Sequence, residues 1–186
     1  MESLFFIGRF HPLVLHLPIG FLILAFLMEW KDRNQENKRF APAVGFALLL
    51  GTLSALVAAV SGFILSKEGA YDADLLNKHQ WLGIGVTLFS GCSYYLHQHR
   101  TISENFNRAY KAMLGISILG ILLTGHMGGS LTHGENYLAE RAPGFLKPIL
   151  GGSNAEKTSK IVIEDLDNAL VLDDLIQPIF EATCTR

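Results

Sequence analysis

The sequence carries little charge. Asp, Glu, Lys and Arg make up 17% of the 186 residues, where an ordinary soluble domain has about 25%. No basic cluster points to a nucleic acid partner, and neither a nucleophile–base pair nor a phosphate-binding loop points to hydrolase or nucleotide chemistry. Only two cysteines are present, Cys92 in an apolar run and Cys184 near the C-terminus, so no disulfide framework is expected.

Apolar residues take the place of the missing charge. They make up 49% of the chain, and the mean hydropathy is +0.30. Four segments hold almost no Asp, Glu, Lys or Arg: residues 10–28, 40–66, 79–99 and 112–134. Crossing a bilayer core of about 30 Å takes about 20 helical residues, and no polar stripe marks the segments as soluble helices. We predict an all-α fold, with a four-transmembrane-helix bundle over residues 1–134 and an extracytoplasmic tail.

Prolines and glycines predict where these helices begin and end. Pro12 suits the first turn of a helix starting near His11, and Pro18 should kink that helix and free a carbonyl near His16. The paired glycines of GHMGGSLTHG should end the last helix near Thr124. No small-residue cleavage site follows the first apolar run, so we expect this helix to stay in the protein.

Positive charge predicts the orientation. The loops between the first and second and between the third and fourth segments hold seven Lys and Arg residues, whereas the other flanks hold five. Loops rich in Lys and Arg stay in the cytoplasm. We therefore expect a multi-pass protein of the bacterial cytoplasmic (inner) membrane, with both termini outside, which is the periplasm in a Gram-negative host.

Histidines gather on one side of this predicted topology. Five of the seven lie at or beyond the outer ends of the apolar segments: His11, His16, His79, His126 and His133. Ionisable groups at membrane depth are costly and usually functional, and neutral imidazole is the commonest metal ligand. The pattern therefore predicts a bound metal or haem near the outer face. His97 and His99 fall on the cytoplasmic side, where we expect them to be solvated.

A b-type haem is the cofactor that this pattern favours. Haem needs two imidazoles and room for a flat ring, and small residues accompany the histidines: Gly83, Gly85, Gly125, Gly128 and Gly129. The segments' outer halves lack the carboxylates of a di-iron site, and no cysteine lies there for structural zinc. Copper or zinc on His16, His126 and His79 is the main competing occupant. A non-redox anchor for an extracytoplasmic domain is a further alternative.

The ligands can be ranked by depth. His16 lies five residues deeper than His11, about 7.5 Å along a helix, and the two are about 140° apart around it. His16 is therefore the preferred axial ligand, with His126 as its partner and His79 next. His11 and His133 remain for propionate contacts, proton movement or a second metal.

Three motifs, HPLVLHLPI, HQWLGI and GHMGGSLTHGENYL, resemble a family of bacterial four-helix membrane domains that precede planctomycete-type cytochrome c domains. The ending LIQPIFEATCTR is similar to the start of such a cytochrome domain. Pro143, Pro148 and the run GGSNA predict a linker over residues 135–155. The resemblance implies the start of a truncated extracytoplasmic cytochrome c-like domain over residues 156–186. Cys184 would be the first cysteine of CxxCH, so haem c is expected only if the remainder follows.

Together these features predict an electron-transfer module. Haem b near the outer face would exchange electrons with the C-terminal cytochrome domain. Membrane quinol, other cytochrome subunits or a larger respiratory complex are the expected partners besides the lipid bilayer. The protein is thus expected to be an electron carrier or redox subunit rather than a stand-alone enzyme.

Overall fold

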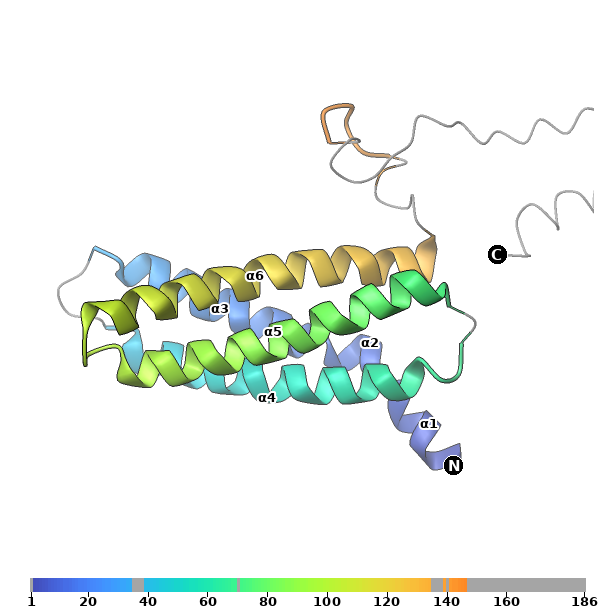
Figure 1. The fold of residues 1–186 in the computed structure, drawn as a ribbon, viewed down its shortest axis with the longest axis horizontal. Helices are drawn as coiled ribbons and strands as arrows, with labels where there is room; N and C mark the ends of the chain where they lie inside the picture. The colour runs from blue at the N-terminus through green and yellow to red at the C-terminus, as the bar shows by residue number, and fades with distance from the viewer. Residues whose placement is uncertain (1, 35–38, 70, 135–138, 140, 147–186) are drawn as a thin grey trace, which may run out of the picture.

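A computed structural model of the chain describes residues 2–34, 39–69, 71–134, 139 and 141–146. This part of the chain is helical and contains no strand, which confirms the predicted all-α class (Figure 1). Its helices are α1 (Glu2–Gly8), α2 (His11–Val14), α3 (His16–Asp32), α4 (Ala41–Leu65), α5 (Ala73–His99) and α6 (Glu104–His133). Of the predicted linker, only residues 139 and 141–146 are described, and the predicted cytochrome start with Cys184 falls entirely outside the described residues.

The four long helices run antiparallel to their sequence neighbours (Figure 1). α3 packs on α4, α4 on α5, α5 on α6, and α6 also touches α3, which closes a bundle. Short connections fix this order. The buried Asp32 carboxylate accepts the Phe40 N–H at 2.6 Å across the α3–α4 connection. Asp72 and Ser103 cap the first turns of α5 and α6.

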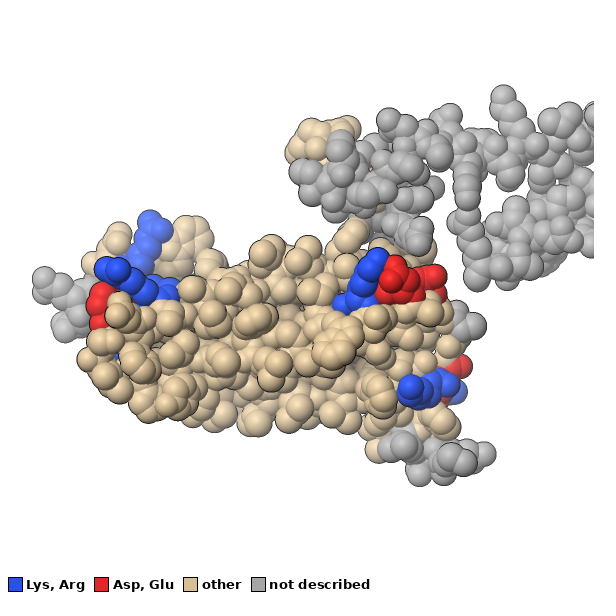
Figure 2. All heavy atoms as spheres, viewed as in Figure 1, with Lys and Arg blue, Asp and Glu red and all other residues tan. Residues whose placement is uncertain are grey.

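The surface of this bundle is suited to lipid. Three stretches are long and apolar enough to cross a membrane: Phe5–Asp32, Ala41–Leu65 and Glu104–His133. Lys, Arg, Asp and Glu lie at the two ends of the visible face and leave the middle uncharged (Figure 2). Large apolar side chains are exposed along the helices, among them Val57, Leu88 and Leu122. A water-soluble protein rarely exposes such a continuous apolar surface.

The third predicted crossing corresponds to α5, which differs from the other three. It spans 27 residues, about 40 Å at 1.5 Å per residue, and it packs between α4 and α6. It is not among the stretches that qualify by composition. It carries polar residues at both of its ends, and it also turns polar residues toward its neighbours: Ser90, Ser93 and His97 are all buried.

Two helix boundaries differ from the sequence prediction. A helix does begin at His11 with Pro12 in its first turn, but α1 precedes it. The last helix runs from Glu104 through the paired glycines to His133, instead of ending near Thr124. Within a membrane, unpaired backbone groups cost more than a glycine in a helix. The helix ends at His133, and the next residue, Gly134, has a φ of 94°, a backbone conformation that glycine adopts readily.

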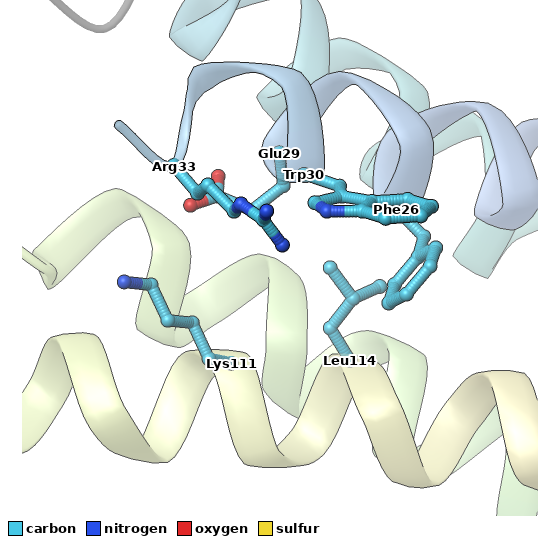
Figure 3. A pocket seen from close by; sticks show the side chains of 6 residues that line it. All are labelled: Phe26, Glu29, Trp30, Arg33, Lys111 and Leu114. Atoms are coloured by element: carbon cyan, nitrogen blue, oxygen red, sulfur yellow. The ribbon is translucent and has the colours of Figure 1, made fainter. Parts of the chain in front are cut away.

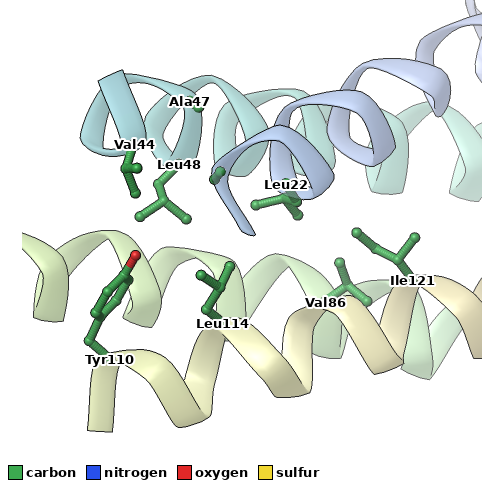
Figure 4. Packing of buried hydrophobic residues seen from close by; sticks show 9 residues of the cluster. Leu22, Val44, Ala47, Leu48, Val86, Tyr110, Leu114 and Ile121 are labelled. Carbon is green, nitrogen blue, oxygen red and sulfur yellow. The ribbon is translucent and has the colours of Figure 1, made fainter. Parts of the chain in front are cut away.

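A small apolar core lies between the α3–α4 and α5–α6 pairs. Leu22, Val44 and Leu48 point toward Leu114 and the ring of Tyr110 from the opposite pair (Figure 4). Gly51 lets Leu22 approach α4, because a Cβ there would lie 2.8 Å from the Leu22 Cδ2. Close contact at small residues is what holds helices together in lipid.

Candidate histidine site

The structure gathers the five predicted histidines at one end of the bundle. We call this the histidine end; it comprises α2, the start of α3, the start of α5 and the last turns of α6 (Figure 1). The opposite end, the basic end, carries most of the described positive charge: Lys31, Arg33, Arg39, Arg100, Arg108 and Lys111. The common location of the histidines follows from the antiparallel order of the helices.

His11 is fixed against α4. Its Nδ1 lies 2.9 Å from the Ala58 carbonyl oxygen, and the Ser61 Oγ is 3.4 Å from the same nitrogen. The ring fits over Gly62, where a Cβ would come within 2.8 Å of the His11 Cε1. The ring is half-buried. Pro12 in the first turn of the short α2 helix helps to set the backbone from which this side chain reaches α4.

His79 is fixed in the same manner against α6. Its Nδ1 lies 3.1 Å from the Thr124 carbonyl oxygen. Gly128, one helical turn further along α6, leaves room for the ring, since a Cβ there would lie 3.2 Å from the His79 Cε1. The Thr124 hydroxyl bonds to the Gly120 carbonyl instead, so the bond of the His79 Nδ1 to Thr124 is to its backbone carbonyl and not to its side chain. Like His11, His79 is half-buried.

The two anchored histidines face each other. Their ring centroids are 6.4 Å apart and the ring planes are nearly perpendicular, at 89°. A neutral imidazole whose Nδ1–H donates to a carbonyl carries its lone pair on Nε2. Carbonyl-anchored imidazoles of this kind are the usual arrangement of metal-binding histidines. His11 and His79 are thus oriented by backbone on two different helices, each with Nε2 as the nitrogen able to bind.

The structure does not assemble the other three histidines in this way. His16 is exposed on α3, and His133 is exposed in the last turn of α6. His126 is half-buried, and its Nδ1 has no hydrogen-bond partner within the described part of the chain. No cluster of three or more His, Cys, Asp or Glu side chains that could hold a metal ion occurs among the described residues. The ranking of His16 and His126 as ligands stays a prediction.

At the basic end, the expectation that His97 is solvated is wrong. His97 is 3% exposed and packs against Tyr110, with ring centroids 5.0 Å apart. The Tyr110 hydroxyl donates to the Glu29 carboxylate at 3.1 Å. The sequence held a signal for this burial: Val86, Ser90, Ser93 and His97 recur at helical spacing and form the buried side of α5.

Two surface grooves also lie at the basic end. The first, of about 380 Å³, is lined by Phe26, Glu29, Trp30, Arg33, Lys111 and Leu114. In it the aromatic rings lie near Leu114, while Arg33 and Lys111 approach from α3 and α6 (Figure 3). The Arg33 guanidinium lies 5.5 Å from the Trp30 ring. The second, of about 470 Å³, lies between α4 and α5 beside His97.

The fold and surface define a helical membrane protein with opposed histidines at one end. Residues 9–136 match the model of a family described as predicted membrane protein (DUF2231), which covers more than half of the chain. The chain therefore belongs to this family. Comparison with curated proteins and with solved structures gave no match.

Proposed function

We propose that the protein is a membrane electron-transfer module that holds a b-type haem at its histidine end. The observation that carries this proposal is the facing pair of His11 and His79, each anchored through Nδ1 to a backbone carbonyl. With ring centroids 6.4 Å apart, the two imidazoles are the residues that would hold a haem iron between α2 and α5.

The number of ligands favours haem over copper or zinc. A haem would need no more than two ligands from the protein, whereas zinc takes three or four protein ligands. The described residues offer a facing pair but no cluster of three. His16, which is exposed, and His126, whose Nδ1 has no hydrogen-bond partner among the described residues, are the remaining sequence candidates.

In such a site, the protein itself would orient the two histidine rings and shield the bound group. The Ala58 and Thr124 carbonyls hold the two rings and set their tautomers. Gly62 and Gly128 give the rings space against α4 and α6. A bound haem would supply the one-electron chemistry. The exchange partner proposed for it is a c-type cytochrome domain to which residues 156–186 would belong, with quinol or other cytochrome subunits in the membrane.

We further propose four crossings of the bacterial inner membrane. α5 is flanked by α4 and α6, both of which qualify as spans, so it occupies the same layer. The basic end lies on the cytoplasmic side, and the histidine end and both termini lie outside. Trp30 and Trp81, exposed at opposite ends of the bundle, fit the two interfacial aromatic belts.

Replacing either anchored histidine tests the haem proposal. Full-length protein from haem-replete cells should show a b-type reduced-minus-oxidised spectrum and a matching pyridine haemochrome. His11→Ala and His79→Ala should each lower haem content at least tenfold. Loss of a group that only orients a metal ligand typically costs about 10–100-fold in metal affinity, and these substitutions remove the proposed ligand itself. His99→Ala is the matched control, since His99 bonds only to Tyr95 of its own helix at the other end.

Each other outcome has a clear meaning. Loss of haem in His16→Ala and His126→Ala, with retention in His11→Ala and His79→Ala, would replace the ligand pair but keep the haem. Colourless wild-type protein with blank metal analysis would leave a non-redox anchor as the better assignment. Copper or zinc in stoichiometric amount would point to the competing metal site.

Orientation can be tested by cysteine labelling. In a background with Cys92 and Cys184 replaced by Ser, Lys67→Cys would mark the histidine end and Thr101→Cys the basic end; both positions are exposed. A membrane-impermeant maleimide should label the Lys67→Cys variant in intact spheroplasts and the Thr101→Cys variant only after lysis. The reverse pattern would place the histidine end in the cytoplasm and exclude an outer cytochrome partner.

A further inference from the structure

His97 is a buried residue of the described chain whose two ring nitrogens both lack a hydrogen-bond partner. Only 3% of its surface is exposed, and both ring nitrogens are buried without a hydrogen-bond partner among the described residues. A buried polar group without a partner destabilises the fold, and an ionisable group inside a membrane bundle usually serves a function. His97 can therefore form a hydrogen bond with a partner that the described chain does not supply.

The surroundings of His97 are built to hold the ring without bonding to it. Tyr110 turns its ring edge-on to the imidazole and commits its hydroxyl to Glu29, at 3.1 Å. Gly45 on α4 leaves space on another side, because a Cβ there would come within 3.2 Å of the His97 Cε1. The imidazole is fixed in place by these contacts, while its hydrogen-bonding capacity stays unused.

His97 lines the groove of about 470 Å³ between α4 and α5. This volume is within the usual range for sites that bind small molecules, about 300–1,000 Å³. The apolar wall is formed by residues such as Pro42, Phe46 and Leu49, and the polar wall by His97, Gln98 and Arg100. No carboxylate lines the groove. It therefore suits a ligand that accepts hydrogen bonds, not a cation.

We propose that this groove binds the head group of an isoprenoid quinone. A quinone ring is flat and apolar and carries two carbonyl acceptors. One matches the Gln98 amide or the Arg100 guanidinium at the groove, and the other matches the His97 imidazole N–H, which the head group must uncover on binding. The tail would leave along Phe46, which is 63% exposed on the apolar surface of α4. A phospholipid phosphate fits less well, because Arg100 is the one cation of the lining and already donates to the His97 carbonyl at 2.8 Å.

The quinone site is separate from the histidine end. His97 lies 18 residues beyond His79 on the same helix, about 27 Å along its axis. Head-group binding at His97 thus needs neither His11 nor His79, and the inference does not rest on the proposed haem. With the basic end in the cytoplasm, the groove would lie at the inner face of the membrane.

The test measures the binding of decylubiquinone to the full-length chain in phosphatidylcholine nanodiscs by isothermal titration calorimetry. Wild-type protein should bind it saturably. His97→Phe keeps a flat ring but removes both nitrogens, so the affinity should fall at least tenfold while the Tm of the ligand-free protein stays equal or rises. His99→Phe, two residues away on the same helix, should bind within twofold of wild type.

A role for His97 in folding alone predicts a different result. In that case His97→Phe would change Tm but leave decylubiquinone affinity unaltered, which would overturn the proposal. A photoreactive azidoquinone on wild-type protein provides a test that needs no variant: the label should fall within residues 41–49 and 94–101. Labelling elsewhere, absence of saturable binding, or loss of binding when phosphatidylglycerol replaces phosphatidylcholine in the nanodiscs would each contradict a quinone site.

Discussion

Gly62→Ala should strongly reduce haem binding at the histidine end, although every histidine stays in the sequence. The new Cβ would lie 2.8 Å from the His11 Cε1 and 2.9 Å from its Nδ1, so the ring must move away from α4. That movement breaks the bond between Nδ1 and the Ala58 carbonyl that orients the ring. Loss of such an orienting contact typically lowers metal affinity about 10–100-fold. Haem content of the purified protein, measured as pyridine haemochrome, should fall accordingly.

Gly115→Ala is the matched control for this experiment. Gly115 lies within the long helix α6 and is not among the glycines beside the histidines, and a Cβ there would meet nothing within 4 Å. Its haem content and thermal stability should stay at the wild-type level. Equal haem loss in the two variants would mean that helix packing in general, and not the position of His11, controls retention. Full retention in Gly62→Ala would show that His11 is not a ligand.

Tyr110→Ala should be among the most destabilising single substitutions in the bundle. Tyr110 is fully buried, packs its ring against His97 and bonds to Glu29 across to α3. Removing a buried aromatic ring leaves a cavity and costs about 3–5 kcal/mol. The hydroxyl alone accounts for less, since hydrogen bonds between membrane helices average about 0.6 kcal/mol. Tyr110→Phe should therefore lower the unfolding free energy by under about 2 kcal/mol.

The comparison that isolates packing is Tyr95→Ala, which removes the same side chain from the exposed surface of α5. Exposed substitutions usually change stability by no more than about 0.5 kcal/mol. Unfolding in a titration with sodium dodecyl sulfate, followed by far-ultraviolet circular dichroism, measures all three variants. If the loss in Tyr110→Ala were no larger than that in Tyr95→Ala, the core between the two helix pairs would not hold the bundle together.

The apolar segments of the sequence predicted the helical class and the separation of charge to the two ends. Both properties follow from the composition of consecutive residues along the chain. Counting crossings also predicted that His11, His79 and His126 lie at one end, since antiparallel helices alternate in direction. Composition was less informative for α5. Its buried Ser90, Ser93 and His97 lower the hydropathy although it packs between two apolar helices.

Tertiary structure decided which side chains meet. Depth in the membrane favoured His16 as a ligand, yet His11 is the histidine fixed on α4 facing His79, while His16 is exposed. Glycine pairs predicted the end of the last helix, yet α6 continues to His133. His97 was expected in solvent and is buried against Tyr110.

These differences have one physical reason. In water, an apolar stripe tells which side of a helix faces the core, because the opposite side must be polar. In lipid, both the core and the surroundings are apolar, so the sequence sets a helix's length and depth but not its rotation about its axis. A rotation of about 100° per residue separates neighbouring side chains. Only packing at small residues, such as Gly51 against Leu22 and Gly62 against His11, selects the rotation and therefore the site.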